Sequence, residues 1–268
     1  YNDMTNEKAT FLGRKKNNGT GTHFMWENRD IRYNVLRAVG YYKGKPVSED
    51  LIVFKGLEQA PNFELLYLDD KKILKGEAGY NYLYRLNCGG DDYTDSFGQL
   101  WLQDNTNYSH SWAENFKDLN PYLASQRTTN DPIHGTRDWK LFQHFRFGRH
   151  QLEVRFPVAD GTYRIELYFT EPWHGTGGSA STDCEGLRIF DVAVNDSVVL
   201  DDLDIWAESG HDGVCKKVVY ATVTGGMLRI HFPEVKAGQA LISGIAIAST
   251  NEELKPTVFP ASDWSWEK

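Results

Sequence analysis

The stretch LNCGGDDYTDSFGQLW (86–101) decides the fold of this chain. It closes a hydrophobic, alternating segment and opens a polar loop crowded with glycines, carboxylates and aromatic residues. Two adjacent glycines at the end of a strand indicate backbone angles that other residues avoid. The clustered aspartates raise the question of calcium, but their spacing matches no known calcium loop. We therefore expect them to cap turns and to accept hydrogen bonds from backbone amides.

Short strand-like runs continue from this stretch to about residue 249. The clearest is TYRIELYF (162–169), whose alternation of apolar and polar residues predicts a half-buried strand. LEVRF (152–156) precedes it across Ala159-Asp160-Gly161, which predicts a hairpin. ALISGIAIA (240–248) predicts a final, wholly apolar strand. Because helical periodicity is almost absent, we expect an all-β sandwich or barrel.

Other turns support the same interpretation. The runs 187–194 and 197–200 are linked by Asn195-Asp196, a two-residue turn of the expected chemistry. The runs 216–223 and 227–232 flank a Gly-Gly pair at 225–226. The nearby aspartates at 201, 202 and 204 are expected to form turns rather than to bind a metal.

The N-terminal residues, 1–56, predict a separate β unit. The runs 31–42 and 45–54 flank Lys43-Gly44, which predicts a hairpin. This unit is too short for a complete immunoglobulin-like sandwich of about 100 residues. We interpret it as the C-terminal part of such a domain. The remaining divisions are a linker at 57–79, a sandwich at 80–250 and a C-terminal tail at 251–268.

Composition excludes several functions. The chain has 268 residues, 40% of them apolar, and a net charge of −8. This negative charge disfavours nucleic acid as a partner, and no apolar run is long enough for insertion into a membrane. The cysteine count rules out a disulfide-dense scaffold. Cys184 and Cys215 either pair or remain thiols, and the sequence leaves both open.

Two loop-like segments carry the candidate chemistry: 102–138, which lacks a convincing strand, and 170–186. Loops this long are uncommon in compact domains and are usually functional or disordered. Both are rich in aromatic residues, whose rings stack on the C–H face of a sugar while carboxylates and histidines bind its hydroxyls. The candidate carbohydrate-binding residues in these two segments are Tyr108, Trp112, Glu171, Trp173 and His174, and the resemblance described below adds Phe147. An alternative is that Trp173 caps the core beneath a long loop.

Catalytic readings find less support in the sequence. A glycosidase requires two carboxylates at a defined separation, and Glu171 is the candidate for one of them. A Gly-x-Ser-x-Gly elbow, a complete P-loop and zinc-ligand spacing are all missing. His211 is expected to order its loop. We expect no cofactor, no metal and no catalytic residue in this chain.

Three blocks in the same order resemble the malectin family, and together they cover about residues 80–250. They are 86–101, then 139–148 followed by 152–174, and then 188–211 with ISGIAIAS (242–249) as the closing strand. The resemblance implies a jelly-roll β-sandwich whose loops hold oligosaccharides between aromatic rings and an acid. By position it places family aromatics at Phe147, at the pair Trp173 and His174, and at Tyr108 or Trp112. VKAGQ (235–239) stands where the family has its acid.

The N-terminal segment NVLRAVGYYKGKPVSED (34–50) resembles a different family. It is similar to the end of the immunoglobulin-like domain that follows the catalytic barrel of family 2 glycoside hydrolases, the β-galactosidase group. The resemblance implies that the chain is the C-terminal portion of a bacterial glycosidase of polysaccharide degradation. Such a parent would be secreted, periplasmic or at the cell surface, and the catalytic barrel is absent from this chain.

The resulting hypothesis is a non-catalytic carbohydrate-binding region that holds an oligosaccharide or polysaccharide near its parent catalytic domain. A first alternative is a purely structural module that braces the barrel or a dimer. A second is a catalytic sandwich that uses Glu171. The sugar and its linkage, and the oligomeric state, are not determined by the sequence.

Overall fold

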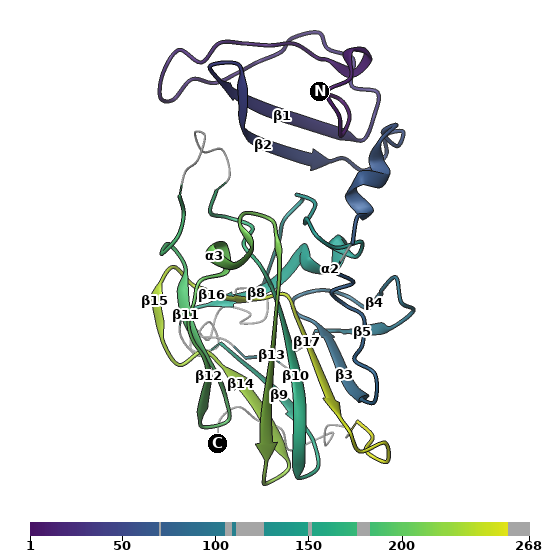
Figure 1. The fold of residues 1–268 in the computed structure, drawn as a ribbon, viewed down its shortest axis with the longest axis vertical. Coiled ribbons are helices and arrows are strands. Elements are labelled where there is room, and N and C mark those ends of the chain that lie inside the picture. Colours follow the sequence, from purple (N-terminus) through teal and green to yellow (C-terminus); the bar gives the residue numbers. More distant parts are fainter. Residues whose placement is uncertain (70, 105–108, 111–125, 150–151, 176–182, 257–268) are drawn as a thin grey trace, which may run out of the picture.

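The computed structural model describes residues 1–69, 71–104, 109–110, 126–149, 152–175 and 183–256 (Figure 1). The regular secondary structure of the described part is almost entirely β-strand, which confirms the all-β class. Its helical elements are single turns, namely η1 (Lys8–Thr10), η2 (Phe63–Tyr67), α2 (Trp139–Phe142) and α3 (Ile205–Ser209). None of the described helices has the length and apolar character needed to cross a membrane.

Two six-stranded sheets form the sandwich. The first has the order β13-β10-β17-β3-β5-β4, with strands β3 (Asn81–Asn87), β4 (Tyr93–Thr94), β5 (Leu100–Gln103), β10 (Gly161–Thr170), β13 (Val214–Val223) and β17 (Gly244–Ser249). The second has the order β12-β11-β14-β9-β6, with β15 beside β11. Its strands are β6 (Ser109–His110), β9 (Glu153–Pro157), β11 (Ile189–Val194), β12 (Ser197–Leu203), β14 (Met227–His231) and β15 (Val235–Ala237).

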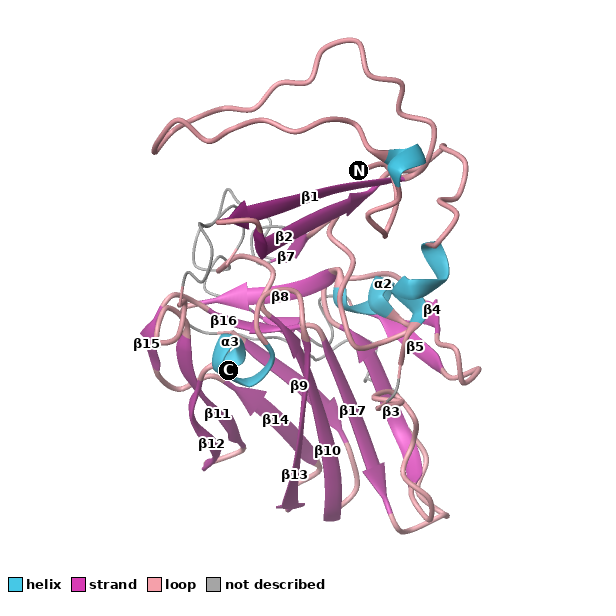
Figure 2. Cartoon of the chain, turned by 45° about the horizontal axis from the view of Figure 1, so that its top comes forward, coloured by secondary structure: helices cyan, strands magenta, loops and turns pink. Residues whose placement is uncertain are grey.

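Two smaller sheets lie above the sandwich. The hairpin of β1 (Val35–Tyr42) and β2 (Lys45–Val53) turns at Lys43 and Gly44, both with positive φ, as predicted. A three-stranded sheet has the order β16-β8-β7, with strands β7 (Gln126–Thr128), β8 (His144–Gly148) and β16 (Ala240–Ile242). Figure 2 shows β8 and β16 crossing between the hairpin and the long strands of the sandwich.

The first sheet is buried on its inner face, and the later half of β10 is buried on its outer face as well. Tyr163, Ile165 and Leu167 of β10 point into the core between the two large sheets. On the opposite face, Glu166 and Tyr168 are also buried, where a half-buried strand was expected. Tyr168 belongs to a second apolar cluster, which joins this face to the hairpin and to η2. Trp101 of β5 and Phe142 of α2 contact the Tyr168 ring and cover this part of the face that the alternation assigned to solvent.

This second cluster also changes the picture of the linker. The segment 57–79 contributes Phe63, Leu66, Ile73 and Leu74, all of them buried. It therefore packs along the sandwich instead of crossing solvent. The assignment of residues 1–56 to part of an immunoglobulin-like domain stays a prediction.

Two predicted strand connections are wrong. The runs 152–156 and 162–169 form β9 and β10, which lie in opposite sheets and do not form a hairpin. The apolar run 240–248 divides at Ser243 into β16 and β17, which also belong to different sheets. By contrast, Asn195, with φ of 51°, does connect the paired strands β11 and β12.

Two further expectations need correction. The segment 102–138, expected to lack strands, contains β6 and β7. Asp201 and Asp202 lie in strand β12 rather than in a turn. Asp204 does cap α3, since its Oδ1 accepts the Ala207 amide at 3.0 Å. Cys215 is a buried free thiol, so the bond to Cys184 is not formed.

The stretch 86–101 has the structural role that its composition predicted, with aspartates that accept hydrogen bonds and a glycine with positive φ. Asp95 accepts hydrogen bonds from the Gln99 amide and the Trp101 indole, both at 2.9 Å. Gly89 has φ of 75°, and a Cβ there would lie 2.8 Å from the Phe145 carbonyl oxygen. The carboxylate of Asp104, fully buried, accepts from the Gly89 amide at 2.8 Å. These bonds fix the crossing of β3, β5 and β8.

Candidate functional site

A groove of about 700 Å³ lies where the hairpin meets the sandwich. One wall is the end of β2 and the residues after it, 52–55. The opposite wall is 127–131, and Pro172 and Trp173 close one side. The volume lies within the range of about 300–1,000 Å³ that is typical of small-ligand sites.

Trp173 is the aromatic residue that this groove presents most openly. Its side chain is 66% exposed, although it follows directly after β10 and two buried residues. The alternative that Trp173 caps the core is therefore wrong. An exposed indole beside a groove provides a flat apolar surface with a polar N–H at its edge.

Glu171 holds the Trp173 loop in place from below. Its Oε1 accepts the amides of Trp173 at 2.9 Å and His174 at 3.0 Å. The Arg188 guanidinium pairs with both carboxylate oxygens and donates to the Gln239 carbonyl at 2.6 Å. Glu171 is fully buried and does not line the groove. It thus positions the loop, whereas the sequence analysis expected it to contact the sugar and, in one alternative, to act as a catalytic carboxylate.

His211 supports the same loop from the other side. Its Nδ1 lies 3.1 Å from the Glu171 carbonyl oxygen, and its Nε2 lies 2.9 Å from Asp212 Oδ2. Burial disfavours the charged imidazole, but the hydrogen bond and charge of Asp212 outweigh it and raise the pKa of His211. This geometry agrees with the loop-ordering role expected for His211.

The other predicted binding residues do not line the groove or lie outside the described part of the chain. Phe147 is partly buried on β8, beneath the Arg127 guanidinium, which lies 5.2 Å from the ring centroid. His174 is half-buried next to Trp173 and does not line the groove. Tyr108 and Trp112 lie outside the described residues. The structure thus brings Trp173 to the groove and connects Phe147 to it through Arg127.

Several groove residues were missed by the sequence analysis. They supply hydrogen-bonding groups around the Trp173 ring, and they are Lys55, Arg127, Thr128 and Asn130. The loop at 129–131 is held by Gln143, whose side chain donates to the Asp131 carbonyl at 3.0 Å. The polar run QRTTND (126–131) could have pointed to these residues. Its strand, β7, has only three residues, which is too short to be recognised from an alternating pattern.

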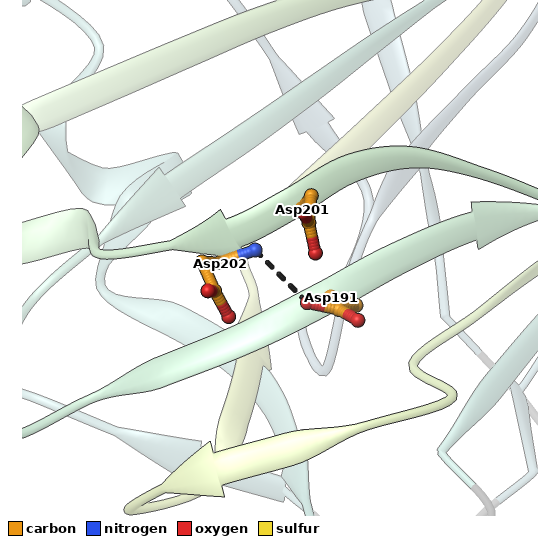
Figure 3. A group of neighbouring side chains, drawn as sticks. All are labelled: Asp191, Asp201 and Asp202. Carbon is orange, nitrogen blue, oxygen red and sulfur yellow. Dashed lines mark hydrogen bonds between the residues drawn. The ribbon is translucent and has the colours of Figure 1, made fainter.

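Among the described residues, one acidic group has the spacing of a cation site. The carboxylates of Asp191, Asp201 and Asp202 lie within 4.8 Å of one another on β11 and β12 (Figure 3). Asp191 Oδ1 accepts the Asp202 amide at 2.9 Å. Lys236 pairs with Asp202, and this hydrogen bond and charge raise the pKa of Lys236. The lysine ammonium therefore compensates part of this negative charge.

The comparison with known families decides the identity of the sandwich. The family profile described as Malectin domain matches residues 82–251, which span both large sheets. The chain belongs to the malectin family. Its sandwich is therefore a malectin carbohydrate-binding domain, as the three sequence blocks implied.

Individual relatives of this malectin domain are distant. Malectin of Danio rerio is 24% identical over 166 residues, which make up 60% of this chain and 52% of the relative. The chain thus spans about half the length of the curated relative that it matches.

The solved structures that match this chain are similarly distant from it in sequence. Bacteroides uniformis β-glucuronidase 2, covalently bound to cyclophellitol-6-carboxylate aziridine, is 23% identical with a TM-score of 0.49. That match covers 84% of this chain and 22% of the glucuronidase chain. The ANX2 ectodomain from Arabidopsis thaliana is 18% identical with a TM-score of 0.48, covering 63% of this chain and 50% of its own.

Proposed function

We propose that the groove beside Trp173 binds an oligosaccharide. The observation that carries this proposal is an aromatic ring, two-thirds exposed, on a loop that a buried ion pair holds at the groove. A sugar ring stacks on the indole, while Arg127, Thr128 and Asn130 bind its hydroxyls. Such a shallow contact supplies few kcal/mol, so a dissociation constant of roughly micromolar to millimolar is expected.

Substitution of the exposed ring tests this function. Trp173→Ala should weaken binding about tenfold, since one stacked aromatic contributes about 1.5 kcal/mol. Tyr42→Ala is the matched control, because Tyr42 is 63% exposed beside the hairpin turn, at the opposite end of β2 from the residues that line the groove. Binding is measured on a glycan array and then by calorimetry with the sugars retained. Equal binding by both variants would contradict the site.

We further propose that the chain is the C-terminal region of a secreted bacterial family 2 glycoside hydrolase. This proposal is supported by the resemblance of residues 34–50 to the domain that follows the catalytic barrel. Tethering a glycan near the active site raises its effective concentration there without new catalytic contacts. The coding sequence upstream of Tyr1 should then encode a barrel with paired glutamates, and a different domain there would refute the parentage.

Structural bracing is the second candidate function. The observation that favours it is the second apolar cluster, which joins the outer face of the malectin sheet to η2 and the hairpin. A domain that only braces its neighbours would bind no sugar in any arm of the glycan array. Sugar binding that depends on Trp173 would show that bracing is not its sole role.

A further inference from the structure

A second groove, of about 670 Å³, lies between the linker turn at 71–78 and the start of β13. It shares no lining residue with the groove beside Trp173. Four lysines line it: Lys71, Lys72, Lys75 and Lys216. This is an unusual concentration of positive charge in a chain whose net charge is −8.

The turn that carries three of these lysines is fixed to the sandwich. Ile73 and Leu74 lie between the lysines and are only 7% and 1% exposed. The Lys75 amide donates to the Lys72 carbonyl at 2.8 Å, and Lys216 Nζ donates to the Ile73 carbonyl at 3.2 Å. The backbone that carries these ammonium groups is therefore anchored, so that only the lysine side chains lose freedom when a ligand binds.

The acidic residues at this groove are already engaged. Glu77 pairs with Arg164 at 3.6 Å, and Glu208 pairs with Lys217 at 2.6 Å. Lys216 itself pairs with the buried Glu166 at 3.0 Å. Within the described part of the chain, Lys71, Lys72 and Lys75 have no ion-pair partner. Three exposed ammonium groups around one concavity repel one another, and an anion in the groove would relieve that repulsion.

The size of the groove and the charge of the molecule limit the ligand. The volume suits a small ligand of one or two sugar units rather than a macromolecule. A long polyanion would extend beyond the groove by more than the screening length of about 8 Å and meet a negatively charged protein. Lysine ammonium groups act as point charges and donate to carboxylate and sulfate oxygens without a fixed geometry.

We propose that the groove of Lys71, Lys72 and Lys75 binds a short acidic oligosaccharide that carries uronate carboxylates or sulfates. The proposal concerns a site separate from the Trp173 groove. The malectin domain and its linker thereby offer two surfaces to one glycan population: an aromatic surface for neutral faces and a basic surface for charged substituents.

Calorimetric titration of the whole chain at low salt tests this site with four probes. They are digalacturonate, a sulfated heparin disaccharide, neutral maltose and hexaglutamate. At least one acidic sugar should bind more tightly than the other two probes, and its identity distinguishes carboxylate from sulfate recognition. Tighter or equal binding of hexaglutamate would overturn the proposal, as would silence from both acidic sugars.

Variants then locate the binding. The triple substitution Lys71→Gln, Lys72→Gln and Lys75→Gln should lower the affinity for the acidic sugar about tenfold or more. The matched control is Lys15→Gln, Lys16→Gln and Lys45→Gln, which removes the same charge from exposed lysines of the N-terminal unit. All six lysines are exposed, so both triple variants should melt like the parent chain. An equal loss in the control would overturn the assignment.

Trp173→Ala separates this proposal from the first one. This variant should retain the acidic sugar while losing the ligand of the aromatic groove. Loss of the acidic sugar in Trp173→Ala would place its binding at the aromatic groove and refute the lysine site.

Discussion

Glu171 and Arg188 illustrate how a buried pair determines what the surface presents. Glu171 is fully buried and Arg188 is 6% exposed, yet their neighbour Trp173 is largely solvent-exposed. The carboxylate accepts hydrogen bonds from two loop amides and from the guanidinium, so the loop that carries the indole is held in place. Sequence composition identified Glu171 as part of the site but not its role, because Arg188 lies 17 positions away in the chain.

Glu171→Gln should both destabilise the domain and weaken glycan binding. Breaking a buried ion pair leaves Arg188 uncompensated and costs about 3 kcal/mol. Glu58→Gln is the control, because its pair with Arg32 is more than half exposed and should contribute less than about 1 kcal/mol. Urea unfolding and calorimetry measure the two effects. Similar losses in the two variants would contradict the positioning role.

At the scale of elements, strand β10 carries a buried network on its outer face. Glu166 accepts from Tyr168 at 2.5 Å and from Tyr82 and Arg164 at 2.9 Å. Burial disfavours its charge, but the Tyr168 hydrogen bond, the charge and hydrogen bond of Lys216, and the Arg164 hydrogen bond prevail and lower the pKa of Glu166. The network satisfies a carboxylate in a place where the alternation predicted solvent.

This lowered pKa predicts an acid-dependent loss of stability. The contribution of Glu166 is fully present above its unfolded pKa of about 4.3 and is lost as the pH falls through the lower folded value. The unfolding free energy of the parent should therefore fall more steeply between about pH 5 and 3 than that of Glu166→Gln. Urea titrations at each pH compare the two slopes, and parallel curves would refute the linkage.

At this scale, the strand connections that could be predicted were those set by residues next to each other in the sequence. Lys43-Gly44 and Asn195 favour backbone angles that close a hairpin, and both hairpins are present. Ala159-Asp160-Gly161 shows similar turn chemistry but connects opposite sheets. A turn motif fixes local dihedral angles, whereas the partner of the next strand depends on distant residues. For the same reason, the groove walls from β2, β7 and the Trp173 loop were not assembled from the sequence.

At the scale of the whole molecule, the second apolar cluster makes the hairpin, the linker and the malectin domain contiguous. Leu74 from the linker is 1% exposed in this cluster, together with Val35 of β1 and Tyr168 of β10. The family blocks predicted the sandwich. They gave no sign of this junction, since apolar residues in a presumed linker have no periodicity to interpret.

Leu74→Ala should destabilise the chain by about 2–5 kcal/mol, as expected when a buried leucine is truncated. Leu65→Ala, on the same segment but 42% exposed, should cost well under that amount. Denaturant unfolding of both variants gives the comparison. A small effect of Leu74→Ala would show that the junction is loosely packed.

The pairing of β3 with β17 has an architectural consequence. Asn81 and Ser249, near the two ends of the malectin domain, are direct partners in the ladder although 168 positions separate them. The chain therefore enters and leaves the malectin domain at adjacent positions. A unit whose two ends are adjacent can lie within a surface loop of a larger protein without separating the ends of that loop.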